Sequence, residues 1–333
     1  MTFWLGNMLK IKLILLLWLI PFILLANDLK TQRESLELSL IEAPFRIFYT
    51  LKGKHAITDV TDLNHNKIPD YVEDTMRHLQ LADFIFKNII GLNDPLKTNR
   101  YRGVEYIDIH LLNIKNPKHL GQAVDTIFIF KRPNGVKTTQ SLSIDLRPNL
   151  EGRTFTPIHE LFHIYQNGYN MMKNPWLVEG LARVAQRAFG YYRLTNAGSP
   201  GLPKTKEQRD RLYTKSYDAF FFWNELMYRV YGKSEIGYKS KILAAKYLDG
   251  RYILNDFSMH GFQFLHQFMS ELEQLEREIE KIRGTKAYQW SASEQLSSQN
   301  NAYIWLAIKN TIVKYHANSI KTNPHIKALF MIE

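Results

Sequence analysis

The sequence of 333 residues contains no cysteine. Disulfide bonds are therefore excluded, and so is the lipid anchor that bacterial lipoproteins carry on a cysteine. An exported chain without disulfides must rely for stability on its hydrophobic core and on any metal ions that it binds. The chain is long enough for such a core, and its 45% hydrophobic and 23% charged residues are typical of a folded globular protein.

The sequence also lacks an apolar segment long enough to cross a bilayer comfortably. The run at 13–26 has about 14 residues, whereas a transmembrane helix needs roughly 20. Because Lys10 and Lys12 precede this run, the pattern is typical of a signal peptide. We expect residues 1–26 to be cleaved off after Ala26 and the mature protein to be periplasmic or secreted. An uncleaved segment that anchors the chain in a membrane is the alternative.

Basic residues are in excess but form no block. The formal net charge is +11, and two of these charges are Lys10 and Lys12 of the expected signal peptide. The other basic residues are interspersed with acidic ones, which favours a solvated surface with loose attraction to anionic envelope polymers. No nucleic-acid-binding motif accompanies the charge, so we expect no nucleic-acid partner.

The pattern of apolar residues divides the chain into a sheet-forming part and a helical part, without internal repeats. Alternating or β-branched and aromatic runs predict strands at 45–51, 104–114, 125–130 and 140–146. Helices are predicted at 71–90, 157–167, 176–189, 208–231, 234–247, 258–283 and 300–316. We therefore expect an α+β protein with an N-terminal α/β region at 27–150 and a largely helical region at 151–333. A short apolar seam in 258–283 predicts packing against 300–316.

The segment "TPIHELFHIYQ", which begins at Thr156, contains two histidines four positions apart. Residues at this spacing share one face of an α-helix, so His159 and His163 can direct their imidazoles at one point. Thr156 and Pro157 predict the start of this helix, and Gly168 predicts its end. His-Glu-x-x-His on a helix is the zinc-binding pattern of metallopeptidases, although so short a pattern also arises by chance.

A catalytic zinc site needs a third protein ligand, for which the sequence offers three sources. The histidine that metzincins place six residues after His163 is absent, because Tyr169 occupies that position. Glu179 lies in the stretch "NPWLVEGLA", where a short loop and a second antiparallel helix would return it to the histidines. A distant aspartate, such as Asp210 or Asp218, has no supporting motif.

HExxH followed by Trp-Leu-x-Glu-Gly-x-Ala resembles the gluzincin superfamily of metallopeptidases, and its aminopeptidase-like branch in particular. The resemblance covers residues 154–232, although the spacing between the second histidine and the glutamate is slightly shorter than in the best-known members. It implies a zincin-like fold, in which a small mixed sheet is followed by an HExxH active-site helix and a largely helical C-terminal region. The matching residues are His159, Glu160, His163, Trp176, Leu177, Glu179, Gly180 and Ala182.

The resemblance also implies a role for each site residue. His159, His163 and Glu179 would bind one catalytic zinc ion and leave a position open for water. Glu160 would take the proton of that water and deliver it to the leaving amine. A tyrosine at the head of a downstream helix stabilises the oxyanion in this branch, and Tyr217 is the better match because it directly precedes an apolar helix. Packing into the aromatic core is the alternative for this tyrosine, and Tyr213 is the next candidate.

A second motif, "DLNHNKIPDYVE" at residues 62–73, has the ligand spacing of an EF-hand-type calcium loop. It also resembles D-x-N-x-N-G-x-P-D-Y-x-E segments of bacterial exported proteins. Lys67 stands where a positive φ usually calls for glycine, at a cost of about 1 kcal/mol. An Asx-turn-rich loop that caps the next helix is the alternative. We expect a structural calcium ion, with ligands Asp62, Asn64, Asn66, the Ile68 carbonyl, Asp70 and Glu73.

Together these motifs predict an exported zinc metallopeptidase that acts on a peptide or protein substrate. An extended peptide would add to an edge strand, for which Gln140–Leu146 is the expected candidate. An inactive zincin-like scaffold that serves as an envelope binding protein is the alternative. The intact Glu160 favours the enzyme, because a binding protein needs no general base. A calcium-stabilised adhesion module would leave the zinc motif unexplained.

Overall fold

The structure is a computed structural model that describes residues 28–132, 135–150, 155–187, 189, 201–232, 240–254 and 261–332. The expected signal peptide at residues 1–26 lies outside these ranges. Within them, no helix is both long enough and apolar enough to cross a membrane.

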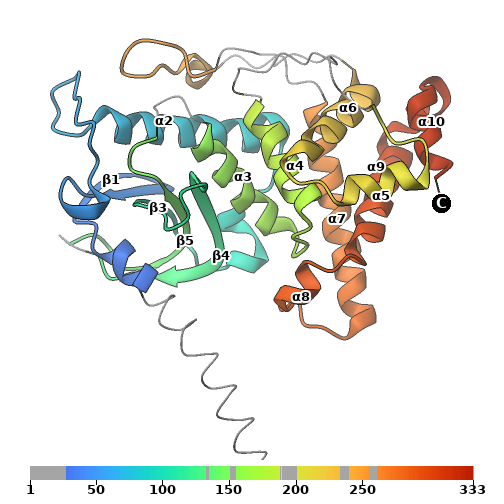
Figure 1. The fold of residues 1–333 in the computed structure, drawn as a ribbon, viewed down its shortest axis with the longest axis horizontal. Helices are drawn as coiled ribbons and strands as arrows, with labels where there is room; N and C mark the ends of the chain where they lie inside the picture. The colour runs from blue at the N-terminus through green and yellow to red at the C-terminus, as the bar shows by residue number, and fades with distance from the viewer. Residues whose placement is uncertain are drawn as a thin grey trace, which may run out of the picture.

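The chain folds as an α+β protein, as the sequence predicts (Figure 1). A five-stranded mixed sheet is built from residues before 150, and the part after residue 155 is mostly helical. The strands are β1 (Leu38–Glu42), β2 (Phe45–Tyr49), β3 (Tyr106–Leu111), β4 (Gly121–Ile129) and β5 (Gln140–Leu146). Four of them match predicted strands, whereas β1 is not predicted.

The strands lie in the order β1-β2-β3-β5-β4. Strands β2, β3 and β5 are parallel, and the two outer strands run antiparallel to their neighbours. The expectation that Gln140–Leu146 is an edge strand is therefore wrong, because β5 is paired on both sides and β4 forms the edge. Ser141, Ser143 and Asp145 make β5 alternate like a half-exposed strand, yet all three are buried.

These polar residues are buried because one face of the sheet carries a network of paired charged side chains packed with buried aromatic rings. The Arg46 guanidinium donates to both carboxylate oxygens of Asp108, at 2.7 and 2.9 Å. Arg33, from a helical segment at 28–34, donates in the same way to Asp145, at 2.9 and 2.7 Å. Buried charges of opposite sign that are hydrogen-bonded in pairs satisfy one another. The alternation of polar and apolar residues in β5 therefore does not mean that its polar side chains face solvent.

The helices surround one continuous hydrophobic cluster that includes residues of both the sheet and the helical part. Helix α2 runs on into a π-helical segment, η2, which ends at Gly91 with a φ of 84°. The helix bounds are α2 (Asp70–Phe84), η2 (Ile85–Ile90), α3 (Thr156–Tyr169), α4 (Pro175–Arg187), α5 (Lys206–Tyr213), α6 (Phe220–Tyr231), α7 (Phe262–Arg283), α8 (Ala292–Gln295), α9 (Asn300–Thr322) and α10 (Pro324–Phe330). Short 3₁₀ turns are η1 (Gly53–His55), η3 (Pro95–Lys97), η4 (Asn99–Tyr101), η5 (Tyr217–Ala219) and η6 (Lys241–Ala244).

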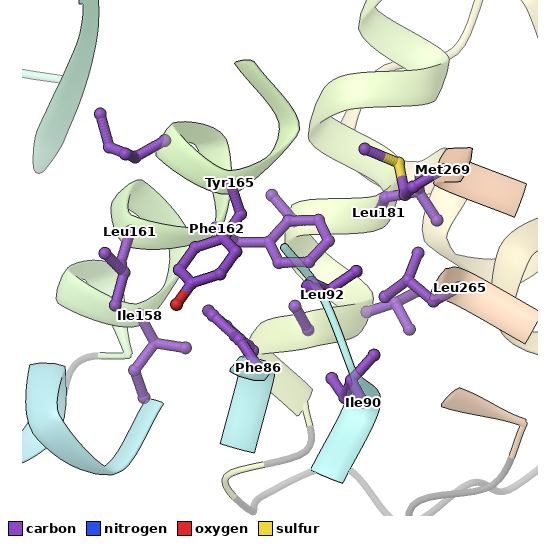
Figure 2. Packing of buried hydrophobic residues seen from close by; sticks show 14 of the residues in the cluster. Phe86, Ile90, Leu92, Ile158, Leu161, Phe162, Tyr165, Leu181, Leu265 and Met269 are labelled. Carbon is purple, nitrogen blue, oxygen red and sulfur yellow. The ribbon is translucent and has the colours of Figure 1, made fainter. Parts of the chain in front are cut away.

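The core fixes the position of helix α3, which carries the HExxH motif. Phe162 and Tyr165 of α3 meet Phe86 edge to face, at ring-centroid distances of 5.3 and 5.2 Å (Figure 2). Leu181 of α4 and Leu265 of α7 belong to the same cluster. The apolar residues of α3 therefore hold this helix against α2, α4 and α7.

The predicted ends of α3 are wrong by one or two residues. Phe155 is the N-cap and Thr156 is the first helical residue, so the Thr156 side chain caps nothing. Gly168 lies inside the last turn, and the helix ends where Asn170 adopts an extended conformation.

Two other predicted helices differ more strongly from the structure. Residues 208–231 form α5, the turn η5 and α6 rather than one helix. The chain breaks at Ser216, whose φ of −129° and ψ of −111° are not helical and whose N–H donates to the Asp218 carboxylate at 3.2 Å. Side chains of this type compete with the helical hydrogen bonds. Of the predicted helix 234–247, the described part contains only the 3₁₀ turn η6.

The C-terminal helices follow the prediction more closely. Helix α7 packs against α9 as predicted, although Ile282 of the predicted apolar seam is 81% exposed. Helix α9 continues to Thr322, with non-helical backbone angles at His316.

Candidate metal centre

Three side chains from two neighbouring helices converge on one point. His159 Nε2 lies 3.1 Å from His163 Nε2 and 3.1 Å from Glu179 Oε2. His163 Nε2 lies 3.6 Å from the same glutamate oxygen. Within the described ranges, these three residues are the only group of three or more His, Cys, Asp or Glu side chains that converge in this way. The structure therefore brings together the three residues that the sequence predicts as zinc ligands.

The triangle of ligand atoms has the size that tetrahedral zinc requires. Two atoms at zinc–ligand distances of about 2.0–2.2 Å and a tetrahedral angle lie about 3.4 Å apart. The three observed distances of 3.1, 3.1 and 3.6 Å bracket this value. Two imidazole nitrogens and one carboxylate oxygen are also the donor set of catalytic zinc sites, which leaves one position of the tetrahedron for water. The residues thus fit a zinc ion.

Gln166 fixes the orientation of His163, and sequence reasoning gave it no role. The Gln166 Oε1 atom lies 2.8 Å from His163 Nδ1, and its Nε2 donates to the Val178 carbonyl at 3.1 Å. Because the amide oxygen can only accept, His163 Nδ1 carries a proton, so in the neutral imidazole that binds zinc Nε2 presents a lone pair to the triangle. Gln166 lies three residues after His163 on the same helix face, and this spacing is the sequence signal that could have identified it.

The charges at the triangle are mutually dependent. Burial opposes ionisation of Glu179, but hydrogen bonds from His159 and His163 hold the pKa of this carboxylate well below its usual value. The side chains of His159, His163 and Glu179 are 8%, 15% and 23% exposed, respectively, so they are mostly buried yet reachable from solvent. A carboxylate beside two imidazole nitrogens in such a place favours a bound cation.

The Glu160 carboxylate reaches the edge strand β4. Its Oε2 atom accepts a hydrogen bond from the Ala123 N–H of β4 at 2.7 Å. The side chain is buried, and burial raises its pKa. Glu160 is therefore held by a backbone donor beside His159 without belonging to the ligand group, which is the place expected of a general base.

Tyr217 lies beside the candidate metal centre, whereas Tyr213 does not. The rings of Tyr217 and His159 have centroids 5.8 Å apart with an interplanar angle of 30°. Burial and the nearby Glu179 carboxylate raise the pKa of Tyr217 to about 12, so its hydroxyl is protonated at neutral pH. Tyr213 instead packs on Trp176, at a ring-centroid distance of 5.2 Å.

The glycine after Glu179 allows the Tyr217 segment to approach α4. A Cβ atom on Gly180 would lie 2.8 Å from Trp223 Cδ1 and 3.0 Å from Ala219 Cβ. Trp223 in turn stacks on Trp176, at 5.4 Å and 9°, and donates from Nε1 to the Trp176 carbonyl at 2.8 Å. The Trp-Leu-x-Glu-Gly stretch thus combines a candidate ligand with the packing that places Tyr217.

The alternative third ligands lie elsewhere. Asp210 pairs with Arg209 at 3.0 Å, and Asp218 pairs with Lys215 at 2.7 Å. Neither aspartate belongs to the converging group.

The 62–73 loop has part of the geometry of a calcium loop. Lys67 has a φ of 71°, as the glycine position of such loops requires. The Asp62 carboxylate accepts the N–H groups of Asn66 and Lys67 at 3.1 and 2.8 Å, and Glu73 accepts the Asn64 amide at 3.0 Å. The acidic side chains of the loop form no converging group, so calcium binding stays a prediction. The calcium ligands expected from the sequence all belong to this loop: Asp62, Asn64, Asn66, Ile68, Asp70 and Glu73.

The fold and site together define an α+β protein with a His-His-Glu triangle of zinc-ligand geometry beside the edge strand of its sheet. Comparison of the chain with protein-family models, with curated proteins and with solved structures gave no match.

Proposed function

We propose that this protein is a zinc-dependent metallopeptidase of the gluzincin type. One observation carries the proposal: three ligand atoms converge at the spacing of tetrahedral zinc, and an additional carboxylate, Glu160, is held one residue from the first ligand. A site that only bound zinc for stability would close the tetrahedron with a fourth protein ligand. The N-terminal pattern at residues 1–26 supports action after export, in the periplasm or outside the cell.

Each residue then has a defined task. When bound, zinc lowers the pKa of water and polarises the scissile carbonyl. Glu160 accepts a proton from the attacking water and passes it to the leaving amine, and burial suits it to this task because it brings the carboxylate pKa nearer to neutral. The protonated Tyr217 hydroxyl donates to the carbonyl oxygen as negative charge develops there.

The edge strand β4 offers a binding site for an extended peptide. Its inner edge pairs with β5, and the Ala123 N–H points the other way, toward Glu160. Since the N–H and C=O of one residue in a strand lie on the same side, the Ala123 carbonyl also faces the outer edge. The exposed side chains of Ile127 and Ile129 lie farther along the strand. A peptide that adds to this edge would pass the carboxylate of Glu160.

The proposal is tested by zinc content and by cleavage of fluorescein-labelled casein. We expect about one zinc per chain, lost in His163→Ala and in Glu179→Ala. Glu160→Gln should retain zinc and lose cleavage by about 10²-fold or more, because the amide accepts no proton.

Two outcomes would contradict the proposal. A protein that carries no zinc, or full zinc retention in Glu179→Ala, would remove the proposed ligand set. Zinc binding with casein cleavage that Glu160→Gln leaves unchanged would remove the mechanism and support the inactive scaffold as an envelope binding protein.

A further inference from the structure

Strand β4 and helix α3 approach one another most closely where Gly121 faces Glu160. A Cβ atom added to Gly121 would lie 2.7 Å from Glu160 Cγ and 2.9 Å from Glu160 Oε1. It would also lie 2.8 Å from Thr156 Cγ2. Distances below 3.0 Å are not tolerated by carbon atoms, so any side chain at this position must displace its neighbours.

The same strand holds Glu160 from a second point. Two residues after Gly121, the Ala123 N–H donates to Glu160 Oε2 at 2.7 Å. The carboxylate therefore lies between a backbone donor, which attracts one oxygen, and the bare Cα of Gly121, beside which the other oxygen lies. The absence of a side chain at 121 leaves the room that the carboxylate occupies.

We propose that Gly121 is a positioning residue that sets the place of the Glu160 carboxylate relative to the metal site. This inference rests on the proposed peptidase function. The three atoms nearest to a Cβ at this position belong to Glu160 and Thr156, so a side chain there would press on the general base before any residue of the triangle.

A side chain at this position would first change the placement of Glu160. Glu160 is long and rotatable, so rotation of its side chain relieves two of the three contacts without moving the backbone. That rotation breaks the bond to Ala123 and takes the carboxylate away from the place in which the strand holds it. Catalytic groups misplaced by about 1 Å can lose about 10²-fold in rate.

Gly121→Ala is the direct test, with Gly168→Ala as the matched control. Gly168 lies in α3, and the nearest atoms that a Cβ there would meet outside its own helix are Thr98 Cγ2 at 3.3 Å and two atoms of Pro95 at 3.7 Å. We expect Gly121→Ala to retain zinc affinity and to lose at least about tenfold in kcat on casein, with KM changed by less than about threefold. Gly168→Ala should match the parent in all three measurements.

A second variant separates displacement of Glu160 from general damage. Thr156→Ser removes Cγ2, one of the three contacting atoms, while it keeps the helix. In the Gly121→Ala background this change should restore part of the lost kcat, because the new methyl group gains room without moving Glu160. Thr156→Ser alone should leave kcat unchanged.

An activity-independent measurement uses a small peptide hydroxamate, which chelates zinc through two oxygens and donates a hydrogen bond to a nearby carboxylate. Gly121→Ala and Glu160→Gln should weaken its binding to a similar extent, and the double variant should bind no more weakly than either single variant. Additive losses, or loss of zinc from Gly121→Ala, would show that the glycine serves the fold and would overturn the inference.

The outcomes also distinguish this inference from the proposed function. If the parent cleaves casein and Glu160→Gln does not, the function stands, and parent-like kcat in Gly121→Ala then refutes only the role of Gly121. If the parent and Glu160→Gln behave alike, the proposed function fails first, and the inference fails with it.

Discussion

Gln166 allows the geometry of the proposed zinc site to be tested without changing a proposed ligand. In Gln166→Met the side chain keeps its length but loses the oxygen that accepts from His163 Nδ1 at 2.8 Å. The imidazole is then free to rotate and its buried N–H loses its partner. Groups that orient a metal-binding histidine are typically worth about 10- to 100-fold in metal affinity, which is about 1.4–2.7 kcal/mol.

A second effect has a different cause and is measured separately. The Gln166 amide also joins α3 to the Val178 carbonyl of α4, at 3.1 Å. Loss of this bond should lower the unfolding free energy of the zinc-free protein by about 1 kcal/mol. Urea unfolding of the metal-free protein measures this loss of stability, and competition with a chromophoric zinc chelator measures the zinc affinity.

Gln166→Glu is the matched control because its carboxylate still accepts from His163 Nδ1 but cannot donate to Val178. We expect this variant to lose stability without zinc, yet to bind zinc within about threefold of the parent. Equal zinc affinity in the parent and Gln166→Met would refute the orienting role. An equal loss of affinity in both variants would attribute the effect to the contact between α3 and α4 instead.

Three further predictions concern other parts of the molecule. Tyr217→Phe should keep zinc and fold but lose about 10²-fold or more in kcat on casein; a parent-like rate would show that the hydroxyl takes no part. Millimolar calcium should raise the melting temperature, and Asp62→Ala with Glu73→Ala should abolish the rise, because a ligand of the folded state stabilises it; no rise in the parent leaves the loop as a turn. Burial raises the pKa of Glu276 to about 7 from 4.5, so the folded state holds a proton more tightly than the unfolded one. Stability should therefore fall by up to about 3 kcal/mol as pH rises from 4.5 to 7, and urea unfolding of Glu276→Gln should lack this slope.

The candidate site was predictable from the sequence because its spacing is local. His159 and His163 are four residues apart on one helix, and helical geometry alone places them on a common face. The loop from Asn170 to Asn174 is short, so the helix that follows must return close to α3 and bring Glu179 with it. The three-ligand triangle required no other long-range information.

The fold was harder to predict where buried polar residues imitate surface residues. Ser141, Ser143 and Asp145 alternate with apolar residues as in an edge strand, but β5 lies inside the sheet. Whether a serine or an aspartate faces water or a buried partner depends on Arg33 and His110, which come from distant parts of the chain. The periodicity of the sequence therefore does not predict such pairing.

The sequence by itself determined the α+β division and the three converging side chains of the candidate site, because both follow from periodicity and from contacts between residues close in the chain. Only the tertiary structure decided which strand forms the edge and that Gly121 of that strand faces Glu160. These features depend on the packing of elements tens of residues apart. At that range, sterics and buried hydrogen bonds decide between arrangements that the local sequence pattern leaves equally favourable.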